Sequence, residues 1–283
     1  MIDVAVATSV PTPSFELQSQ GLMDALASKG VEAQRYLWAD VSGAPAPPLP
    51  ARMTLLWSLY ESDVRTDRFQ HWAEHAGSES QLVNPFDAVR RSRDKKYLTD
   101  LDEAGIPTVP SMWCETRGST VEFLTARVDW KAFVLKSARG GSVLRFDRDE
   151  CEIAQRHMAE IDGDALLQPY LSQVAQEGVL AMHYIGGEFS HAGRHFPGGQ
   201  NWRTQAGESR IERAEVNGSQ LEIADAAVSL LAGDCSFARV DLIRDIDGPP
   251  SVIQLETAGC QMGLDLIEDA ADRLVECLIR QLG

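Results

Sequence analysis

Apolar residues in the first part of the chain follow two spacings, one typical of buried strands and one typical of helices. Leu22 and Leu26 predict a helix that Gly30 caps. Four residues at i, i+3, i+4 and i+7 predict a second, amphipathic helix: Phe69, Trp72, Ala73 and Ala76. Short apolar runs predict four strands, at 3–8, 31–38, 53–60 and 81–84. Strands that alternate with helices favour a small parallel α/β domain.

The rest of the chain mixes helices and strands in another order. Ser92 is a good N-cap for a helix that turns Tyr97, Leu98 and Leu101 inward and ends at Gly105. Ser219 and Glu222 form a capping-box pattern, and a last helix is expected over 264–282. Further strands are expected at 133–137, 166–171, 179–185 and 188–194, with one more that ends at Phe146. The first turn, 8–14, has no GxGxxG, so a Rossmann dinucleotide site is not supported.

The segment 237–257 is the most informative one for chemistry. Asp247-Gly248 is a turn signal between two strand-like runs, which predicts a hairpin. Alternate side chains of a strand share a face, so Ile253 and Leu255 would join the core. The opposite face would gather four polar side chains: Arg239, Asp241, Gln254 and Glu256. Carboxylate and amide oxygens at this spacing suit Mg²⁺, although an ordinary solvated hairpin face fits the same pattern.

Two lysines and a glycine-rich loop point to an anionic ligand. Lys136 ends an apolar strand, and the loop that follows contains Gly140, Gly141 and Ser142. Glycines allow backbone N–H groups to approach a phosphate, and a lysine adds a point charge. Lys95 lies near the start of a helix, where anions are attracted. Each feature alone is weak, since Gly-Gly also marks hairpin turns and most isolated lysines lie on the surface.

The run 166–171 is apolar, with one amide and one proline. Its exposed main-chain edge beside Leu171 could pair with an adenine ring. A plain edge strand explains the same residues equally well.

Composition narrows the classes of function. The chain has 283 residues and a formal net charge of −16, which disfavours broad nucleic-acid binding. The five cysteines have no metal-ligand or CxxC spacing, no run approaches the ~20 apolar residues of a membrane helix, and the first residues lack a basic signal region. We therefore expect a cytoplasmic protein with reduced thiols and no membrane partner.

Taken in order, these elements resemble the ATP-grasp family over nearly the whole chain. The matching stretches are Leu82-Val-Asn-Pro-Phe86, Asp94-Lys-Lys-Tyr-Leu98, Ala104-Gly-Ile-Pro-Thr-Val-Pro110, Gly187-Glu-Phe-Ser-His-Ala192 and Arg239-Val-Asp241. They are most similar to the subgroup of D-cycloserine ligase and relatives of RimK-type glutamate ligases. The resemblance implies an α/β ATP-grasp fold in three parts. These are a Rossmann-like domain over 1–84, a central lid subdomain over 85–170 and a C-terminal antiparallel subdomain with the metal site over 171–283.

The resemblance also implies roles for the candidate residues, with ATP and Mg²⁺ as cofactors. Lys95 and Lys136 would hold the phosphates, under the loop of Gly140, Gly141 and Ser142. Gln168, Tyr170 and Leu171 would line the adenine pocket, and Asp241, Gln254 and Glu256 would face the metal. Arg239 would lie beside the transferring phosphoryl group or the acyl oxygen, and Arg203 would point into the active site.

The implied reaction is ligation of a small, amino-acid-like carboxylate to an amine. The carboxylate attacks the γ-phosphorus of ATP, and a nitrogen nucleophile then displaces phosphate from the acyl phosphate. Three residues depart from the family pattern: Gln254 stands where Glu is usual, Val179 where Glu is common, and His195 where the subgroup has Lys. Two alternatives therefore stay open, ring closure within one molecule and a nucleotide-binding partner protein without catalysis. A homo-oligomer is compatible with all three readings.

Overall fold

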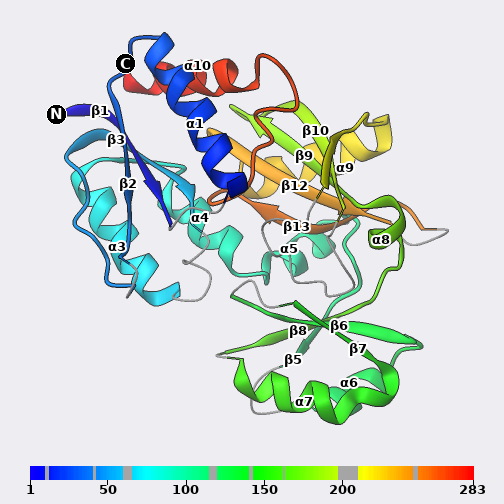
Figure 1. Cartoon of the computed structure of the whole chain (residues 1–283). Coiled ribbons are helices and arrows are strands. Elements are labelled where there is room, and N and C mark those ends of the chain that lie inside the picture. Colours follow the sequence, from blue (N-terminus) through cyan, green and yellow to red (C-terminus); the bar gives the residue numbers. More distant parts are fainter. Residues whose placement is uncertain are drawn as a thin grey trace.

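The computed structural model of the chain describes residues 1–9, 13–40, 43–59, 66–114, 120–139, 143–161, 163–196, 210–244 and 248–283. Its strands form three sheets, which Figure 1 shows as three separate groups of arrows. No helix in these ranges is long and apolar enough to cross a membrane.

The first sheet is parallel and is covered on both faces. Its strand order is β2 (Ala33–Leu37), β1 (Ile2–Thr8), β3 (Ala51–Ser58) and β4 (Gln81–Val83). Helix α1 (Pro13–Ser28) and the C-terminal helix α10 (Ala270–Leu282) pack in one hydrophobic cluster with this sheet. Helix α3 (Thr66–Glu79) packs in a second cluster, which includes Trp38 and Leu56. The predicted parallel α/β unit is thus confirmed, and the residues predicted to face inward from α1 and α3 are buried.

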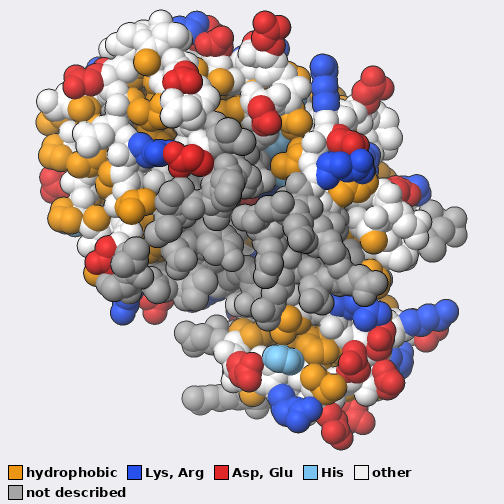
Figure 2. Space-filling view, viewed as in Figure 1, with side chains coloured by type: hydrophobic (Ala, Val, Ile, Leu, Met, Phe, Trp, Pro, Cys, Tyr) orange, Lys and Arg blue, Asp and Glu red, His pale blue; other side chains and the backbone are white. Residues whose placement is uncertain are grey.

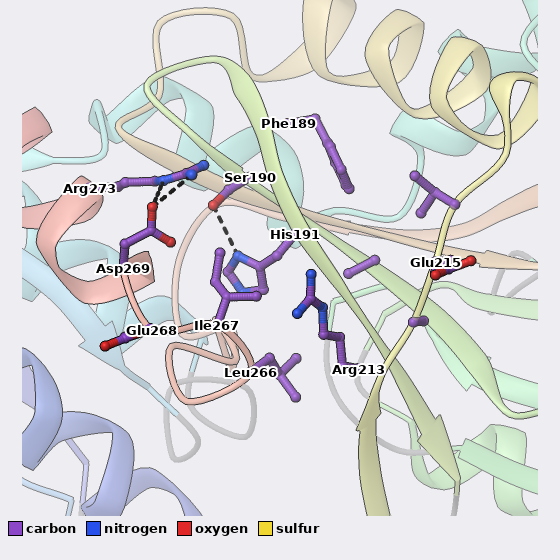
Figure 3. Close-up of a pocket in the computed structure, with 13 residues that line it drawn as sticks. Phe189, Ser190, His191, Arg213, Glu215, Leu266, Ile267, Glu268, Asp269 and Arg273 are labelled. Carbon is purple, nitrogen blue, oxygen red and sulfur yellow. Dashed lines mark hydrogen bonds and ion pairs between the residues drawn. The ribbon is translucent and has the colours of Figure 1, made fainter.

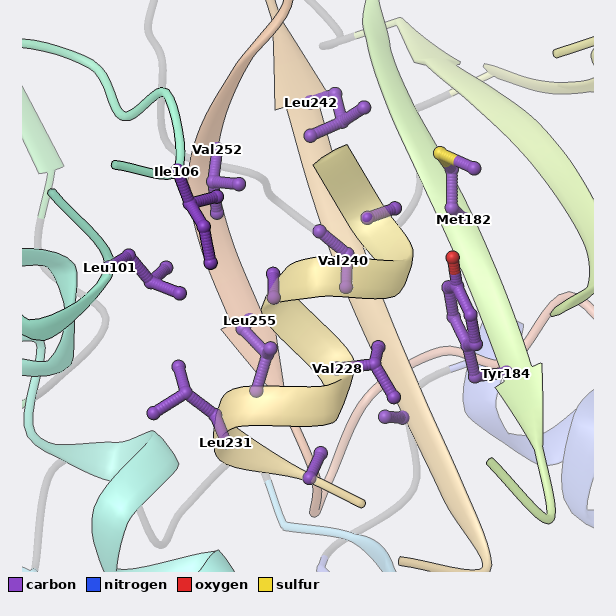
Figure 4. Packing of buried hydrophobic residues seen from close by; sticks show 14 of the residues in the cluster. Leu101, Ile106, Met182, Tyr184, Val228, Leu231, Val240, Leu242, Val252 and Leu255 are labelled. Atoms are coloured by element: carbon purple, nitrogen blue, oxygen red, sulfur yellow. The ribbon is translucent and has the colours of Figure 1, made fainter. Parts of the chain in front are cut away.

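The second sheet is the antiparallel core of the C-terminal half. Its order is β11 (Arg210–Arg213), β10 (Glu188–Phe196), β9 (Val179–Ile185), β12 (Phe237–Ile243) and β13 (Ser251–Glu256). Helix α9 (Gly218–Leu231) crosses one face, and Figure 4 shows Val228 and Leu231 among apolar side chains of β12 and β13. Helices α4 (Phe86–Arg93) and α5 (Tyr97–Glu103) also contact β13. The other face of the sheet carries Arg239 and Asp241, while Ile185 and Phe237 at one end of that face pack in the cluster of the first sheet.

The third sheet lies apart from the other two, at the bottom of Figure 1. Its order is β5 (Met112–Cys114), β8 (Ala165–Pro169), β6 (Ala132–Ser137) and β7 (Val143–Asp147), all antiparallel. Helices α6 (Val121–Thr125) and α7 (Cys151–Glu160), the latter after a short 3-10 turn (Arg148–Glu150), complete its small core around Phe133 and Phe146. A one-turn helix, α8 (Gln173–Glu177), leads from this sheet to β9.

Several predicted boundaries are wrong. Ser92 does not start a helix: it lies in the last turn of α4, where its hydroxyl contacts Val89 O and Thr257 Oγ1. The chain then breaks before α5, because Asp94 adopts an extended conformation. The last helix begins at Ala270 rather than Leu264.

The cap of α9 also differs from the prediction. Asn217 and Gln220 form the capping box in place of Ser219 and Glu222, since the side chain of Asn217 accepts from Gln220 N at 3.0 Å. Asn and Ser are comparable N-caps, so residue type could not distinguish Ser219 from the alternative two residues earlier.

Candidate active site

The polar face of the β12–β13 hairpin forms one wall of the candidate site. Arg239 pairs with Glu256 across the two strands and Asp241 with Gln254, so the four predicted polar residues do share a face. A bulge follows, because Leu242 pairs with Val252 and leaves Ile253 without a position in the ladder. Val252 and Leu255 are therefore fully buried in the core, while Ile253 is only half-buried. The prediction that Ile253 faces the core with Leu255 is wrong, because one extra residue reverses the alternation.

Arg239 lies at the centre of this wall. Its Nε is 2.8 Å from Asp241 Oδ1, and its second terminal nitrogen is 2.9 Å from both Asp241 Oδ2 and Glu256 Oε2. The side chains of Arg239 and Asp241 are only 12% and 10% exposed. Burial acts to lower the pKa of Arg239, but the two carboxylates outweigh it and raise that pKa. Gln254 Nε2 donates to Glu256 Oε1, so all four residues belong to one network.

Lys136 comes to the same place from the third sheet. It is the last residue but one of β6, is 8% exposed, and makes no side-chain hydrogen bond or ion pair within the described residues. Burial, then the nearby positive charge of Lys95, lowers the pKa of Lys136 to about 7, while Asp241 opposes the shift. The structure therefore brings the two predicted lysines close to each other and to the predicted metal ligand Asp241.

Lys95 lies in the break between α4 and α5, two residues before α5 begins. Its backbone N–H donates to Ala138 O at 3.0 Å, which fixes the start of the glycine-rich loop against this break. The Arg139–Asp94 salt bridge at 3.2 Å joins the same two segments, and the Lys96–Asp164 salt bridge at 2.8 Å joins the break to the residue before β8. A backbone hydrogen bond thus keeps the segments that carry Lys95 and Lys136 next to each other.

The strand β8 lies beside these lysines and carries the predicted adenine residues. Gln168 is fully buried and donates to Ser111 Oγ at 2.9 Å, while its Oε1 has no partner among the described residues. The guanidinium of Arg145 stacks over the Tyr170 ring at 4.8 Å, and Leu171 packs on a small cluster with Val109 and Val174. β8 is not an edge strand, since it pairs with β6 on one side and with β5 on the other. Its pairing with β5 ends at Leu167, so the main chain is open on that side only from Gln168 onward.

Four predicted site residues, Gly140, Gly141, Ser142 and Arg203, lie outside the described residues. Their roles stay predictions.

Asn84 was missed as a functional residue, although the Asn-Pro step after an apolar strand was a signal for it. It is fully buried, and its Nδ2 donates to Phe237 O at 2.7 Å and to Thr257 O at 2.6 Å. Its Oδ1 accepts from the backbone N–H of Ser236 at 2.6 Å. Asn84 therefore joins the first sheet to the start of β12 and to the residue that follows β13, and it positions the polar wall.

Three histidines of strands β9 and β10 lie in the same sheet as Arg239 and Asp241. His195 lies near Arg239 and Asp241, and burial, then Arg239, lowers its pKa to about 4. His183 and His191 stack at 4.6 Å between ring centroids, and His191 Nε2 donates to Met262 O at 2.9 Å. Lowered pKa values keep both of these rings neutral, and both side chains are buried in the sheet.

Comparisons with known proteins support this geometry. The sequence matches no family model. It is 27% identical over 310 aligned positions to the cycloserine biosynthesis protein DcsG of Streptomyces lavendulae, covering 99% of this chain and 98% of the relative. The crystal structure of D-cycloserine synthetase DcsG superposes with a TM-score of 0.84 at 25% identity, covering 99% of both chains. D-alanine–D-alanine ligase from Bacillus anthracis, complexed with ATP, shares the fold with a TM-score of 0.71 at 16% identity over 100% of this chain and 97% of the ligase.

Three sheets in this order give the chain the fold of the ATP-grasp ligases. Among proteins with that fold, the chain is similar in both sequence and structure to D-cycloserine synthetase DcsG.

Proposed function

We propose that the chain binds Mg-ATP between the third sheet and the polar wall of the second. Lys95 and Lys136 hold the phosphates there, and the observation that carries the proposal is the state of Lys136. Burial and Lys95 lower the pKa of Lys136, so an anion bound beside it would favour its ammonium form. A nucleotide phosphate supplies that anion, and the open main chain after Leu167 with the unpaired Gln168 Oε1 suits the polar edge of an adenine ring.

The metal ligands in this proposal are Asp241, Gln254 and Glu256. Within the described ranges, no three His, Cys, Asp or Glu side chains gather into a ready-made metal cage. Two carboxylates and one amide suit Mg²⁺, which usually completes its shell with phosphate oxygens and water. When bound, the cation would neutralise phosphate charge during transfer.

Catalysis by this chain is then positioning and electrostatic stabilisation. Arg239 lies beside the carboxylates that face the metal, so it can stabilise the oxyanion that forms when nitrogen adds to the acyl phosphate. Cys260, in the same region, is not the nucleophile. It is buried, and burial, then Glu256, raises the pKa of its thiol, which keeps it protonated. An acyl phosphate on the substrate needs no protein nucleophile.

The proposal is tested with a screen of amino acids and their analogues for ADP release. A carboxylate that stimulates release is then labelled with ¹⁸O and the label is followed into phosphate. One ¹⁸O transferred per turnover supports the acyl phosphate. AMP and pyrophosphate would indicate adenylation instead, and unlabelled phosphate would indicate a kinase or a simple ATPase.

Ring closure within one molecule is the second candidate reaction. It is favoured by the match to DcsG, which covers nearly all of both chains. In that case a single substrate would release ADP without any added amine, and its product would be lighter than the substrate by one water. A requirement for a separate amine would exclude ring closure.

The proposal also covers the substrates, partners, cellular location, assembly and domain division of the protein. The substrates are small molecules, and we propose no membrane or nucleic-acid partner, a cytoplasmic location and a homo-oligomer as the assembly to test. On the face seen in Figure 2, the described acidic and basic side chains are interspersed, which fits the net charge of −16. The division of the chain into three domains, with boundaries at 84/85 and 170/171, stays a proposal. It assigns α4 and α5 to the central subdomain, although both helices contact β13 of the C-terminal one.

A further inference from the structure

A second concave site lies at the β10–β11 edge of the same sheet, where strand β9 separates it from the polar wall of β12 and β13. It is a cavity of about 660 Å³ between the β10–β11 edge and the segment that leads into α10. Figure 3 shows it, and none of the predicted ATP-binding or metal-binding residues lines it. Its size falls in the range of small-molecule pockets.

The cavity has a built floor and lip. His191 is 4% exposed, and both ring nitrogens are engaged, Nε2 with Met262 O and Nδ1 with Ser190 Oγ at 3.0 Å. Leu266 forms the lip and fits closely over Gly193, where an added Cβ would approach its Cδ1 to 2.7 Å. Any larger residue at 193 would push Leu266 out of place, so the shape of the cavity depends on this glycine.

Two opposite charges on its walls, Arg213 and Glu215, are not paired with each other, unlike Asp269 and Arg273, which also line the cavity and form an ion pair at 2.7 Å. Arg213 ends β11, and the ladder continues one residue further, because Ala214 N donates to Ala192 O at 2.9 Å. Arg213 and Glu215 are therefore two residues apart in extended chain and point to the same side. Within the described part of the chain, neither has an ion pair or a side-chain hydrogen bond.

The opposite face of β11 provides an internal comparison. Arg210 and Glu212 have the same spacing, and they close into an ion pair at 2.8 Å. Arg213 and Glu215 line the cavity and stay open. The same two residue types at the same spacing thus neutralise each other on one face, while on the cavity side they are available to a ligand.

We propose that this cavity binds a zwitterionic, amino-acid-type ligand with an apolar side chain. Arg213 receives the carboxylate through charge-assisted hydrogen bonds, and Glu215 receives the ammonium group. Phe189, Leu266 and Ile267 supply the apolar surface for the side chain. None of the residues assigned to ATP or to the metal lines this cavity, so its existence does not depend on how ATP is used.

The test is equilibrium dialysis of the full chain with radiolabelled leucine, as L and D enantiomers, without ATP. Two competitors each carry one of the two charges, 4-methylpentanoate and 3-methylbutylamine. We expect leucine to bind, and each competitor to bind at least about tenfold more weakly. Failure of both leucine enantiomers to bind at millimolar concentration would overturn the proposal.

Variants locate the binding. Arg213→Gln and Glu215→Gln change exposed side chains, so folding should be unaffected, and each should weaken leucine binding about tenfold. Arg210→Gln on the opposite face is the matched control and should leave leucine binding unchanged. Unchanged affinity in Arg213→Gln would contradict the proposal. So would loss of binding in Lys136→Met, which would place leucine in the active site instead.

Discussion

Two buried basic side chains from two different sheets, Arg239 and Lys136, lie in the candidate active site, and their pKa values are shifted in opposite directions. Arg239 belongs to the hairpin, where two carboxylates on the same face raise its pKa. Lys136 belongs to the third sheet, and burial beside Lys95 lowers its pKa to about 7. The hairpin thus contains the counter-charges of Arg239, whereas Lys136 forms no ion pair within the described residues and would be held in its ammonium form by an anionic ligand. We infer that the hairpin is preorganised and that the third sheet is the part that responds to nucleotide.

The largest expected effect comes from removing a counter-charge of the hairpin. Asp241→Asn takes away a proposed metal ligand and one of the two carboxylates that hold Arg239, so we expect turnover to fall by at least about 10²-fold. Steady-state ADP release with the activating carboxylate measures it. Glu177→Gln is the control, since Glu177 forms an exposed ion pair with Arg244 and should keep its activity. Wild-type turnover in Asp241→Asn at low Mg²⁺ would remove Asp241 from the site.

Lys136 should affect binding more than folding. Lys136→Met removes a charge-assisted contact to phosphate, which is worth about 1.5–3 kcal/mol, so calorimetry should show a corresponding loss of ATP affinity. The melting temperature should stay the same or rise, because a buried charge without a partner is replaced by an apolar side chain. Lys131→Met, an exposed lysine just before β6, is the control. Equal ATP affinity in wild type and Lys136→Met would show that Lys136 does not contact the nucleotide.

The lowered pKa of Lys136 predicts a pH dependence with a definite sign. Between about pH 7 and 10.5 this lysine is protonated in the unfolded chain and neutral in the ligand-free fold, so its contribution to stability rises with pH. Phosphate favours the ammonium form, and ATP binding at pH 8 should therefore take up a proton. Calorimetry in two buffers of different ionisation enthalpy measures the uptake. Its persistence in Lys136→Met would assign the proton to another group.

The smallest effect is expected at Gln254. Gln254→Glu replaces an amide that donates to Glu256 with a third carboxylate, which should lower stability without metal by up to about 1 kcal/mol. If Gln254 is a metal ligand, Mg²⁺ affinity should be kept or raised. Thermal unfolding and Mg²⁺ titration of ADP release separate the two effects. A fall in Mg²⁺ affinity would indicate a site adapted to less negative charge.

Regular alternation made much of this site predictable from sequence. Arg239, Asp241 and Glu256 share a face because strand geometry requires it, and Lys136 follows an apolar strand that could be recognised directly. Ile253 could not be placed, because the bulge depends on how β12 and β13 pair and not on their separate patterns. The break between α4 and α5 was missed for a related reason, since Ser92 is used in contacts with Val89 and Thr257 instead of as a cap.

The contacts of Asn84 bear on how the molecule can move. Because this side chain joins the first sheet to the ends of β12 and β13, those two sheets should behave as one rigid block. The third sheet is connected to that block by two chain segments, one after Val109, whose N–H is still held by Val252 O at 3.1 Å, and one around Leu171. Two connecting segments that lie side by side would let the third sheet rotate about one axis. Lys136 would then move toward or away from the carboxylates along one arc, and opening would break the contacts of the α4–α5 break with Ala138, Arg139 and Asp164, so these contacts favour the closed arrangement.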